Sequence, residues 1–388
     1  MKKMSNFFRL PILMILLFVS CDNKSITGPS GPEPMTSLDA ITYLSSLKLG
    51  VNTGWWFSAY PHWESNVTSD NPFMNQVMNQ AYMNGVASTG FDIVNLPVTW
   101  MPFIGDAPDY KVNKVRLQRV AEAVNMAKNA GLKIIINVNH DDGWMNGESF
   151  SDDGWLRIDK AAKSEEAKKE ITAKFQAVWR QIAEYFKDYG DYLIFRSMGE
   201  PTDGNWSLPI AQASLDIVNE WNKVFVDTVR ATGGNNSSRF LILPGYGADA
   251  RFTIGNFILP PDSKNNVNKL IVSLHYYQPW DLTHTHIMQS WGTVSDKAAV
   301  DKSFNDMKKE YIDKGIAVIL DEFGTLHNAA MENVHKEYIS YVVGVSTELG
   351  IPALHHEDHA DFIFFNRITG RLDPRMESYV QAMKNAVK

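Results

Sequence analysis

Short apolar runs recur along the chain, and each is followed by a loop and then by a longer segment with helical periodicity. The runs are almost continuously apolar, which is typical of strands that are buried on both faces of a parallel sheet. They are Leu49–Val51, Asp92–Leu96, Leu132–Val138, Tyr192–Phe195, Phe240–Leu243, Leu270–Leu274, Ala317–Leu320 and Ile351–Leu354. We therefore predict eight buried strands that alternate with helices.

The segments between the runs carry apolar residues on one helix face only. In the longest of them, the residues that follow the three- and four-residue spacing are Ile171, Phe175, Val178, Ile182 and Tyr185. Similar patterns end before Gly131, Gly315 and Gly350, where glycine closes a helix at low cost. Eight strands alternating with helices predict a (β/α)8 TIM barrel. A doubly wound open sheet is the competing architecture, but no Gly-x-Gly-x-x-Gly segment follows a run.

The N-terminal 35 residues differ from the rest of the chain. Lys2 and Lys3 precede an apolar run, residues 10–19, which is too short to span a bilayer and ends just before Cys21. This order predicts a lipoprotein signal peptide over residues 1–20 and a lipid on Cys21. Residues 21–35 are rich in Ser, Gly, Pro and Asn and predict a flexible tether to a single folded domain, residues 36–388. The alternative is an ordinary secretory signal in which the cysteine is incidental.

The composition limits the classes of molecule that the protein can bind. The net charge of -7 and the pI near 5.8 argue against nucleic acid, because its phosphates require a basic surface. Cys21 is the only cysteine, so the folded domain contains no disulfide. We expect an exported monomer without a cofactor, held at the cell envelope or cell surface through the lipid alone.

Two glutamates stand where buried runs pass into loops. Glu200 follows the run that begins at Tyr192, and Glu322 follows the run that begins at Ala317. The loops after the strands of a barrel gather at one face, where barrel enzymes place their chemistry. Two carboxylates there suggest an acid and a nucleophile on either side of a glycosidic bond. Either glutamate alone could instead cap the helix that follows it.

Tryptophans gather in the same post-strand loops. Flat aromatic rings at the mouth of a cleft suit the apolar faces of pyranose rings, although some of these rings will simply pack the loops. The tryptophans that we predict to contact substrate are Trp55, Trp100, Trp144, Trp206 and Trp280.

These segments together resemble glycoside hydrolase family 5, the cellulase family, from about Leu47 to Lys388. The stretch from Phe195 to Pro201 is similar to the family motif that carries the acid/base glutamate. The stretch from Ile319 to Gly324 is similar to the motif that carries the nucleophile. The resemblance implies a retaining β-glycosidase of the endoglucanase type that acts on a β-glucan or a related plant-type polysaccharide.

The resemblance also implies roles for individual residues. Glu322 would be the nucleophile and Glu200 the acid/base. His275 and Tyr277 match the His-x-Tyr element that lines the cleft beside the nucleophile, and His140 would contact the sugar.

Several positions depart from the family pattern, and two of them also count among the predicted substrate contacts. Asn95 replaces an arginine, Gly199 replaces the asparagine before the acid/base, and His356 replaces an aromatic platform that is usually tryptophan. Asn139 replaces the first histidine of a pair, and Arg196 stands where an acidic residue is common. We expect Gly199 to open space in the cleft, and we count Asn139 and His356 among the substrate contacts. The missing arginine removes a charge that helps to keep the nucleophile ionised, so either another group compensates, or the enzyme is slow, or it is not a hydrolase.

Two other functions remain open from the sequence. The lost family residues are compatible with a sugar-binding barrel of impaired activity. Histidines and acidic residues in the post-strand loops could instead ligate a transition metal. The residues that would take part are His140, Asp141, Asp142, His275, His284, His286, His327, His355, His356, Glu357, Asp358 and His359.

Overall fold

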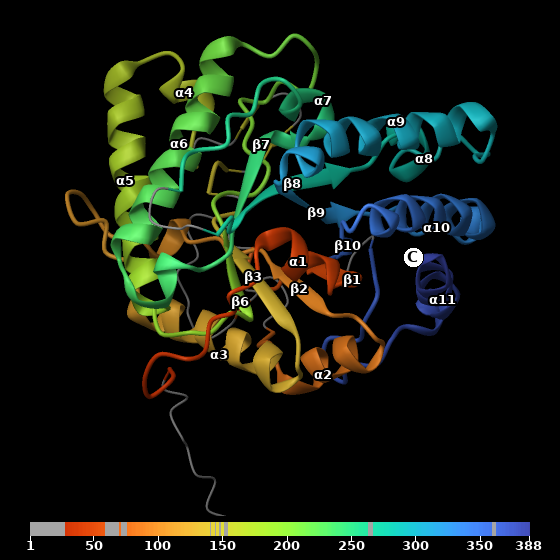
Figure 1. The fold of residues 1–388 in the computed structure, drawn as a ribbon, viewed down its shortest axis with the longest axis horizontal. Coiled ribbons are helices and arrows are strands. Elements are labelled where there is room, and N and C mark those ends of the chain that lie inside the picture. The colour runs from red at the N-terminus through yellow and green to blue at the C-terminus, as the bar shows by residue number, and fades with distance from the viewer. Residues whose placement is uncertain are drawn as a thin grey trace, which may run out of the picture.

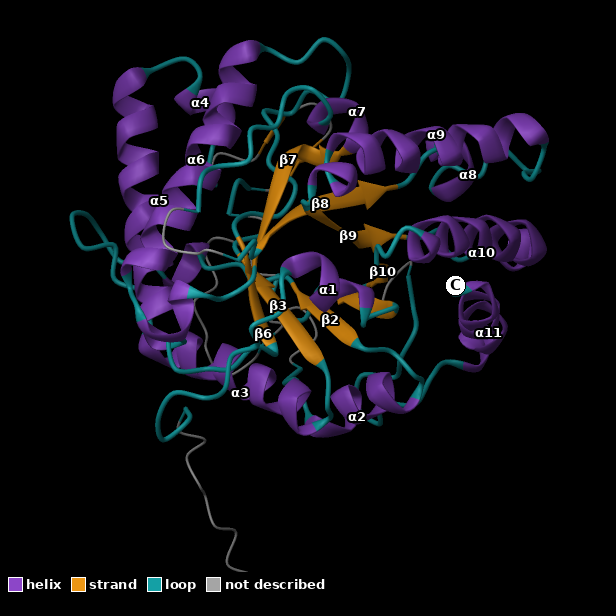
Figure 2. Ribbon diagram, viewed as in Figure 1, coloured by secondary structure: helices purple, strands orange, loops and turns teal. Residues whose placement is uncertain are grey.

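Eight parallel strands close into a barrel that is surrounded by helices, as Figures 1 and 2 show. The computed structural model describes residues 28–58, 70, 76–139, 141–143, 145–146, 149–150, 154–262, 267–358 and 362–388. The predicted (β/α)8 barrel is confirmed. The predictions for Cys21, His140, Trp144 and His359 lie outside the described residues.

The strands follow the predicted order along the chain. They are β1 (Leu49–Thr53), β2 (Ile93–Leu96), β3 (Lys133–Asn137), β6 (Leu193–Arg196), β7 (Leu241–Asp249), β8 (Leu270–Tyr276), β9 (Ala317–Phe323) and β10 (Ala353–Glu357). Around the barrel their order is β1, β10, β9, β8, β7, β6, β3 and β2. Two short strands, β4 (Met145–Asn146) and β5 (Ser149–Phe150), form a separate antiparallel pair.

The helices also match the predicted pattern. They are α1 (Ala40–Ser45), α2 (Gln80–Ser88), α3 (Lys114–Asn129), α4 (Ile158–Ala161), α5 (Glu165–Tyr185), α6 (Gln212–Ala231), α7 (Ala250–Thr253), α8 (Trp280–Thr283), α9 (Val294–Glu310), α10 (Glu332–Glu348) and α11 (Glu377–Ala386). In α5 the predicted stripe is buried except for Tyr185, which is 38% exposed at the end of the helix. Among the described residues, none of the helices is both long enough and apolar enough to cross a bilayer.

Several strands run further than their apolar cores predict, and β7 continues as far as Asp249. β8, β9 and β10 continue through the polar residues His275, Glu322 and His356, which the sequence placed in loops. The register of β8 on β9 shifts between Leu274 and His275, so a bulge lies directly below the site. Bulges next to active sites redirect side chains. The hydrogen-bonded ladder thus carries the site residues on rigid backbone.

The floor of the barrel is closed by α1. Tyr43 and Leu44 of this helix are buried against the first residues of the strands. The ring of Tyr43 stacks on Phe240 with a centroid distance of 4.1 Å. The barrel residues of this cluster are Ile93, Ile135, Ile194, Ile242, Ile271, Ala317, Ile319 and Leu354. They lie toward the amino ends of the strands, so the floor is opposite the predicted site.

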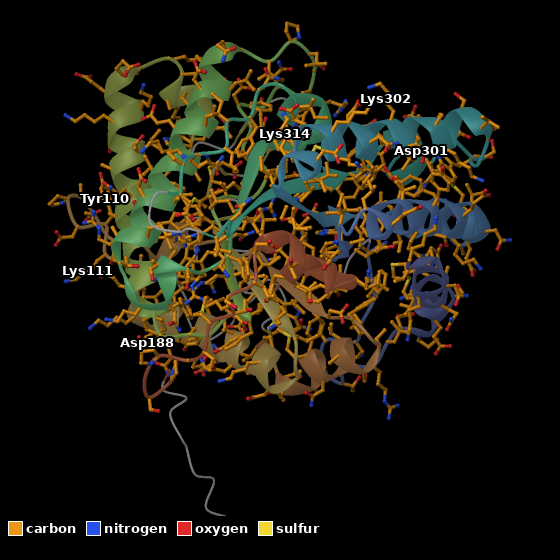
Figure 3. All side chains as sticks on the ribbon, in the orientation of Figure 1. Tyr110, Lys111, Asp188, Asp301, Lys302 and Lys314 are labelled. Atoms are coloured by element: carbon orange, nitrogen blue, oxygen red, sulfur yellow. The ribbon has the colours of Figure 1, made fainter. Side chains whose placement is uncertain are left out.

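The chain reaches α1 along the base of the barrel. Glu33 donates its backbone N–H to the carbonyl of Asp188, which Figure 3 labels, and its carboxylate accepts from the backbone of Gly190 and from the hydroxyl of Tyr192. Lys128 forms an ion pair with the same carboxylate. The predicted tether, residues 21–35, is therefore bound to the barrel at its described end.

Candidate active site

The two predicted glutamates lie beside each other at the carboxyl ends of their strands. Glu322 is carried within β9, and Glu200 follows β6 by four residues, on a turn held by the bond from Gly199 N–H to the carbonyl of Val138. A carboxylate oxygen of each and a ring nitrogen of His275 lie within 4.8 Å of one another. This spacing is close to that of the carboxyl pair in retaining glycosidases.

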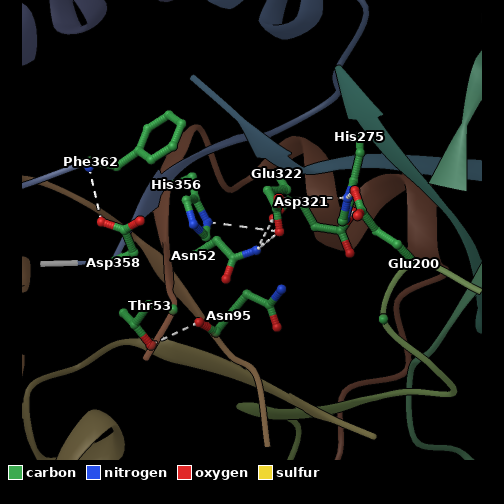
Figure 4. Close-up of polar contacts among 12 residues, drawn as sticks. Asn52, Thr53, Asn95, Glu200, His275, Asp321, Glu322, His356, Asp358 and Phe362 are labelled. Carbon is green, nitrogen blue, oxygen red and sulfur yellow. Dashed lines mark hydrogen bonds and ion pairs between the residues drawn. The ribbon is translucent and has the colours of Figure 1, made fainter. Parts of the chain in front are cut away.

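Glu322 is held by three neighbours. The Tyr277 hydroxyl donates to Oε1 at 2.8 Å, and the Asn52 side chain donates to Oε2 at 2.5 Å. His356 Nδ1 lies 3.8 Å from Oε2, and Figure 4 shows Asn52 and His356 both directed at this carboxylate. Sequence reasoning missed Asn52. Its signal was the polar pair that ends β1, a strand that is otherwise apolar.

The surroundings of Glu322 favour its charged form. Burial by itself would raise the pKa of Glu322. The imidazoles of His275 and His356 and the hydroxyl of Tyr277 act in the opposite direction, as does the guanidinium of Arg196, and the net effect is a lowered pKa. A carboxylate that stays ionised is suited to act as a nucleophile.

Glu200 is the more exposed carboxylate, with 37% of its side chain accessible against 18% for Glu322. Its Oε1 lies 2.6 Å from His275 Nδ1. The other ring nitrogen, Nε2, lies 2.9 Å from a guanidinium nitrogen of Arg196. A guanidinium can only donate, so in the neutral form of His275 Nε2 accepts and Nδ1 donates its hydrogen to Glu200.

A cleft extends on both sides of the glutamates. On one side lies a cavity of about 340 Å³, whose walls include Trp55, Asn139 and Gly199. On the other side lies a cavity of about 650 Å³, whose walls include Tyr277 and Trp280. Both cavities are bordered by Glu200, Trp206, Glu322 and His356. The carboxylates therefore stand in the middle of the groove.

The comparison with known proteins agrees with this geometry. The sequence profile of Cellulase (glycosyl hydrolase family 5) matches residues 54–355. The chain belongs to glycosyl hydrolase family 5. It is therefore a β-glycoside hydrolase that acts on β-glucans.

Three relatives illustrate the match. Endoglucanase B of Clostridium cellulovorans is 34% identical over 80% of this chain and 66% of its own length. Endoglucanase A of Paenibacillus barcinonensis is 30% identical over 87% of this chain and 86% of its own. The solved structure of a GH5-4 broad specificity endoglucanase from Bacteroides salanitronis has a TM-score of 0.82 and 33% identity, and the match covers 92% of this chain and 97% of that one.

The missing family arginine has a substitute in this cellulase-family chain. Asn95 is fully buried, and its carboxamide has no hydrogen-bond partner among the described residues. Arg196 enters the site from β6 instead, with its Nε 3.2 Å from Asp321 Oδ2. Both partners of this ion pair are almost fully buried, and Arg196 contributes to the lowered pKa of Glu322. A cation on another strand, together with His275, His356 and Tyr277, therefore favours the charged form of Glu322.

Gly199 does not open the cleft as predicted. The carboxamide of Asn139 lies in the space in front of it, and a Cβ at position 199 would come within 1.8 Å of Asn139 Oδ1. The sequence could not reveal this, because the contact joins loops that follow two different strands.

The tryptophans divide between the cleft and the core. Trp55, Trp206 and Trp280 line the cavities, as predicted for substrate contacts. The prediction for Trp100 is wrong, because its ring is fully buried and its Nε1–H donates to the carbonyl of Asn137. Trp100 thus braces the end of β3 and has no surface to offer a sugar.

Apart from His275, none of the strand-end histidines in the described part of the chain belongs to a group with metal-ligand spacing. His355 is buried against Phe364 and His284 stacks on Trp280, so neither faces the other. Asp141 accepts bonds from the backbone of Trp100 and the ring of Trp155. Among the described residues, the one group with ligand spacing consists of Glu200, Glu322 and His275 themselves.

Proposed function

We propose that this enzyme cuts β-glucan chains internally by double displacement with retention of configuration. The observation that carries the proposal is the close pair of carboxylates in a cleft that continues on both sides. A groove with sugar-binding surface on either side of the reacting groups suits a bond inside a chain. The separation of the carboxylates leaves no room for a water molecule between nucleophile and sugar, as inversion would require.

In the first step, a carboxylate oxygen of Glu322 attacks the anomeric carbon while Glu200 gives its proton to the departing glycosidic oxygen. The covalent glycosyl-enzyme that forms contains one new C–O bond, and the leaving chain departs with a free hydroxyl. In the second step, Glu200 removes a proton from water, the water oxygen attacks the anomeric carbon, and the Glu322 carboxylate is released. Tyr277 and Asn52 hold Glu322 in position through their bonds to it.

The choice of polymer is tested by a panel of soluble and insoluble polysaccharides. We expect release of reducing ends from at least one of cellulose, mixed-linkage glucan, xyloglucan and glucomannan, with mannan as the comparison that lacks glucose. Internal cleavage predicts that viscosity falls steeply while few reducing ends have appeared. Slow loss of viscosity with steady release of short sugars would contradict internal cleavage. The absence of product from every polymer would contradict hydrolysis.

We also propose that the mature enzyme is a monomeric lipoprotein at the cell envelope or cell surface. The basic start, the short apolar run and Cys21 support the anchor. One chain brings together Glu200, His275 and Glu322 at the end of its own barrel, which supports a monomer. In this arrangement the lipid is the enzyme's contact with the membrane, and a polysaccharide or oligosaccharide is its substrate.

A further inference from the structure

The side chain of Asn139, on the loop after β3, fills the space beside Gly199, on the loop after β6. An ideal Cβ on Gly199 would lie 1.8 Å from Oδ1 of Asn139 and 2.9 Å from its Cγ. The Asn139 carboxamide therefore occupies the space that a side chain at position 199 would fill. Gly199 is not among the glycines with positive φ, so its backbone does not require glycine. Glycine is required at this position because Asn139 approaches so closely.

The backbone around Asn139 is fixed from several directions. Its N–H donates to the carbonyl of Val98 at 3.0 Å, and its carbonyl accepts from the hydroxyl of Thr99 at 2.8 Å. The N–H of Gly199 donates to the carbonyl of Val138 at 2.9 Å, which joins the two loops. These bonds set the position of the Asn139 backbone, from which the carboxamide projects toward Gly199.

The carboxamide of Asn139 is available to bind a ligand in the cavity. Among the described residues, no hydrogen bond of the Asn139 side chain is found, and this side chain forms part of the cavity wall. Glu200 directly follows Gly199, and Glu322 borders the same cavity. A carboxamide offers donors and an acceptor, which matches a sugar hydroxyl.

We propose that Asn139 binds the 2-hydroxyl of the sugar whose anomeric carbon is attacked by Glu322. This inference rests on the proposed function. In this proposal the loop after β3 supplies the amide, and glycine at position 199 leaves room for it. Contacts to the 2-hydroxyl strengthen in the transition state, so the effect of losing Asn139 belongs mainly to kcat.

The first test removes the amide. We expect Asn139→Ala to lower kcat/KM on an aryl β-cellobioside roughly 100-fold, the usual scale for one lost transition-state hydrogen bond. On the analogue that lacks the 2-hydroxyl on the ring next to the aryl group, the wild type and the variant should differ by less than about threefold, because the bond is already absent. Asn84→Ala, on the exposed face of α2, is the matched control and should change neither substrate.

The second test moves the amide back. Gly199→Asn alone should lower activity, because its side chain collides with Asn139. The double variant Asn139→Gly with Gly199→Asn should be at least about tenfold more active than Gly199→Asn alone, which is a coupling typical of side chains in contact. Gly31→Asn is the matched control, since a Cβ there meets no atom within 4 Å.

The outcomes separate this inference from the proposed function. An active wild type with equal losses on both aryl substrates would overturn the role of Asn139 and leave hydrolysis intact, as would a double variant no better than Gly199→Asn. An inactive wild type would contradict the proposed function. The inference would then be decided by calorimetry with cellotriose, where unchanged binding by Asn139→Ala would overturn it and weaker binding would support it.

Discussion

At the residue scale, the site depends on a division of labour between two glutamates. Glu322 is enclosed by hydrogen-bond donors, whereas Glu200 is more exposed and meets one ring nitrogen of His275. A nucleophile benefits from groups that keep it charged, and an acid/base needs access to the leaving oxygen and to water. The two environments therefore match the two roles that the sequence resemblance implied.

The two roles can be separated by leaving group. We expect Glu200→Gln to lower kcat/KM roughly 10²- to 10⁴-fold on polysaccharide, the usual contribution of general acid catalysis. With a dinitrophenyl cellobioside the loss in kcat/KM should be far smaller, because that leaving group needs no proton. Glu322→Gln has the same shape as the parent but should inactivate the enzyme toward both substrates. Equal losses for Glu200→Gln on the two substrates would contradict its role as the acid.

The lowered pKa of Glu322 makes a prediction for the pH profile. A lowered pKa keeps the nucleophile ionised as pH falls, so activity persists into acid. His356→Asn removes a group that favours the charged form, so the pKa of Glu322 should rise. The acid limb of kcat/KM should then move to higher pH, with its plateau reached later. His327→Asn, on the loop after β9, is the control, and an acid limb that stays in place in His356→Asn would contradict this account.

The contact between Asn139 and Gly199 could not be predicted from either residue alone. The sequence identified both as departures from the family and predicted empty space at Gly199. The space is filled by a residue 60 positions away (199 minus 139), through the packing of two loops. Arg196 and Asn95 illustrate the same limit, because a charge lost from β2 reappears on β6.

At the element scale, apolar periodicity located every barrel strand, but it placed the carboxyl ends of β8, β9 and β10 too early. Those ends contain His275, Glu322 and His356, and hydrophobicity alone cannot assign polar residues to a ladder. They belong to the strands because their backbones pair, while their side chains turn toward the cleft. The prediction that Trp100 contacts substrate was wrong for a different reason. An aromatic ring in a loop can face either the core or the solvent, and this one faces the core.

The short helix α1 makes a stability prediction. Leu44 is 1% exposed and packs into the barrel floor, so Leu44→Ala should lower the free energy of unfolding by about 2–5 kcal/mol. Leu38→Ala, at a side chain that is 43% exposed, should change it by less than about 0.5 kcal/mol. Denaturant unfolding measures both. The kcat/KM of folded Leu44→Ala should match the wild type, because the floor lies opposite the cleft.

At the scale of the whole molecule, the N-terminal segment and the cleft lie at opposite ends of the barrel. Glu33 and α1 contact the base, whereas Glu200 and Glu322 stand at the carboxyl ends of the strands. A lipid on Cys21 would therefore attach the enzyme through the end of the barrel that lies opposite the cleft.

Removal of the anchor tests this arrangement. We expect Cys21→Ser to move the protein from the membrane fraction to the soluble fraction, since no other segment is proposed to hold it there. Its kcat/KM on a soluble glucan should equal that of the wild type, because the base of the barrel takes no part in catalysis. A Cys21→Ser protein that remains with the membrane would contradict the anchor.

The stereochemistry of the first product tests the central claim most directly. Proton NMR of the wild-type reaction on a soluble β-glucan, recorded before mutarotation, reports the configuration of each new reducing end. Attack by Glu322 followed by attack of water from the opposite face predicts that the β-anomer appears first and the α-anomer only later. Initial formation of the α-anomer would mean a single displacement by water, and it would contradict the assignment of Glu322 as nucleophile.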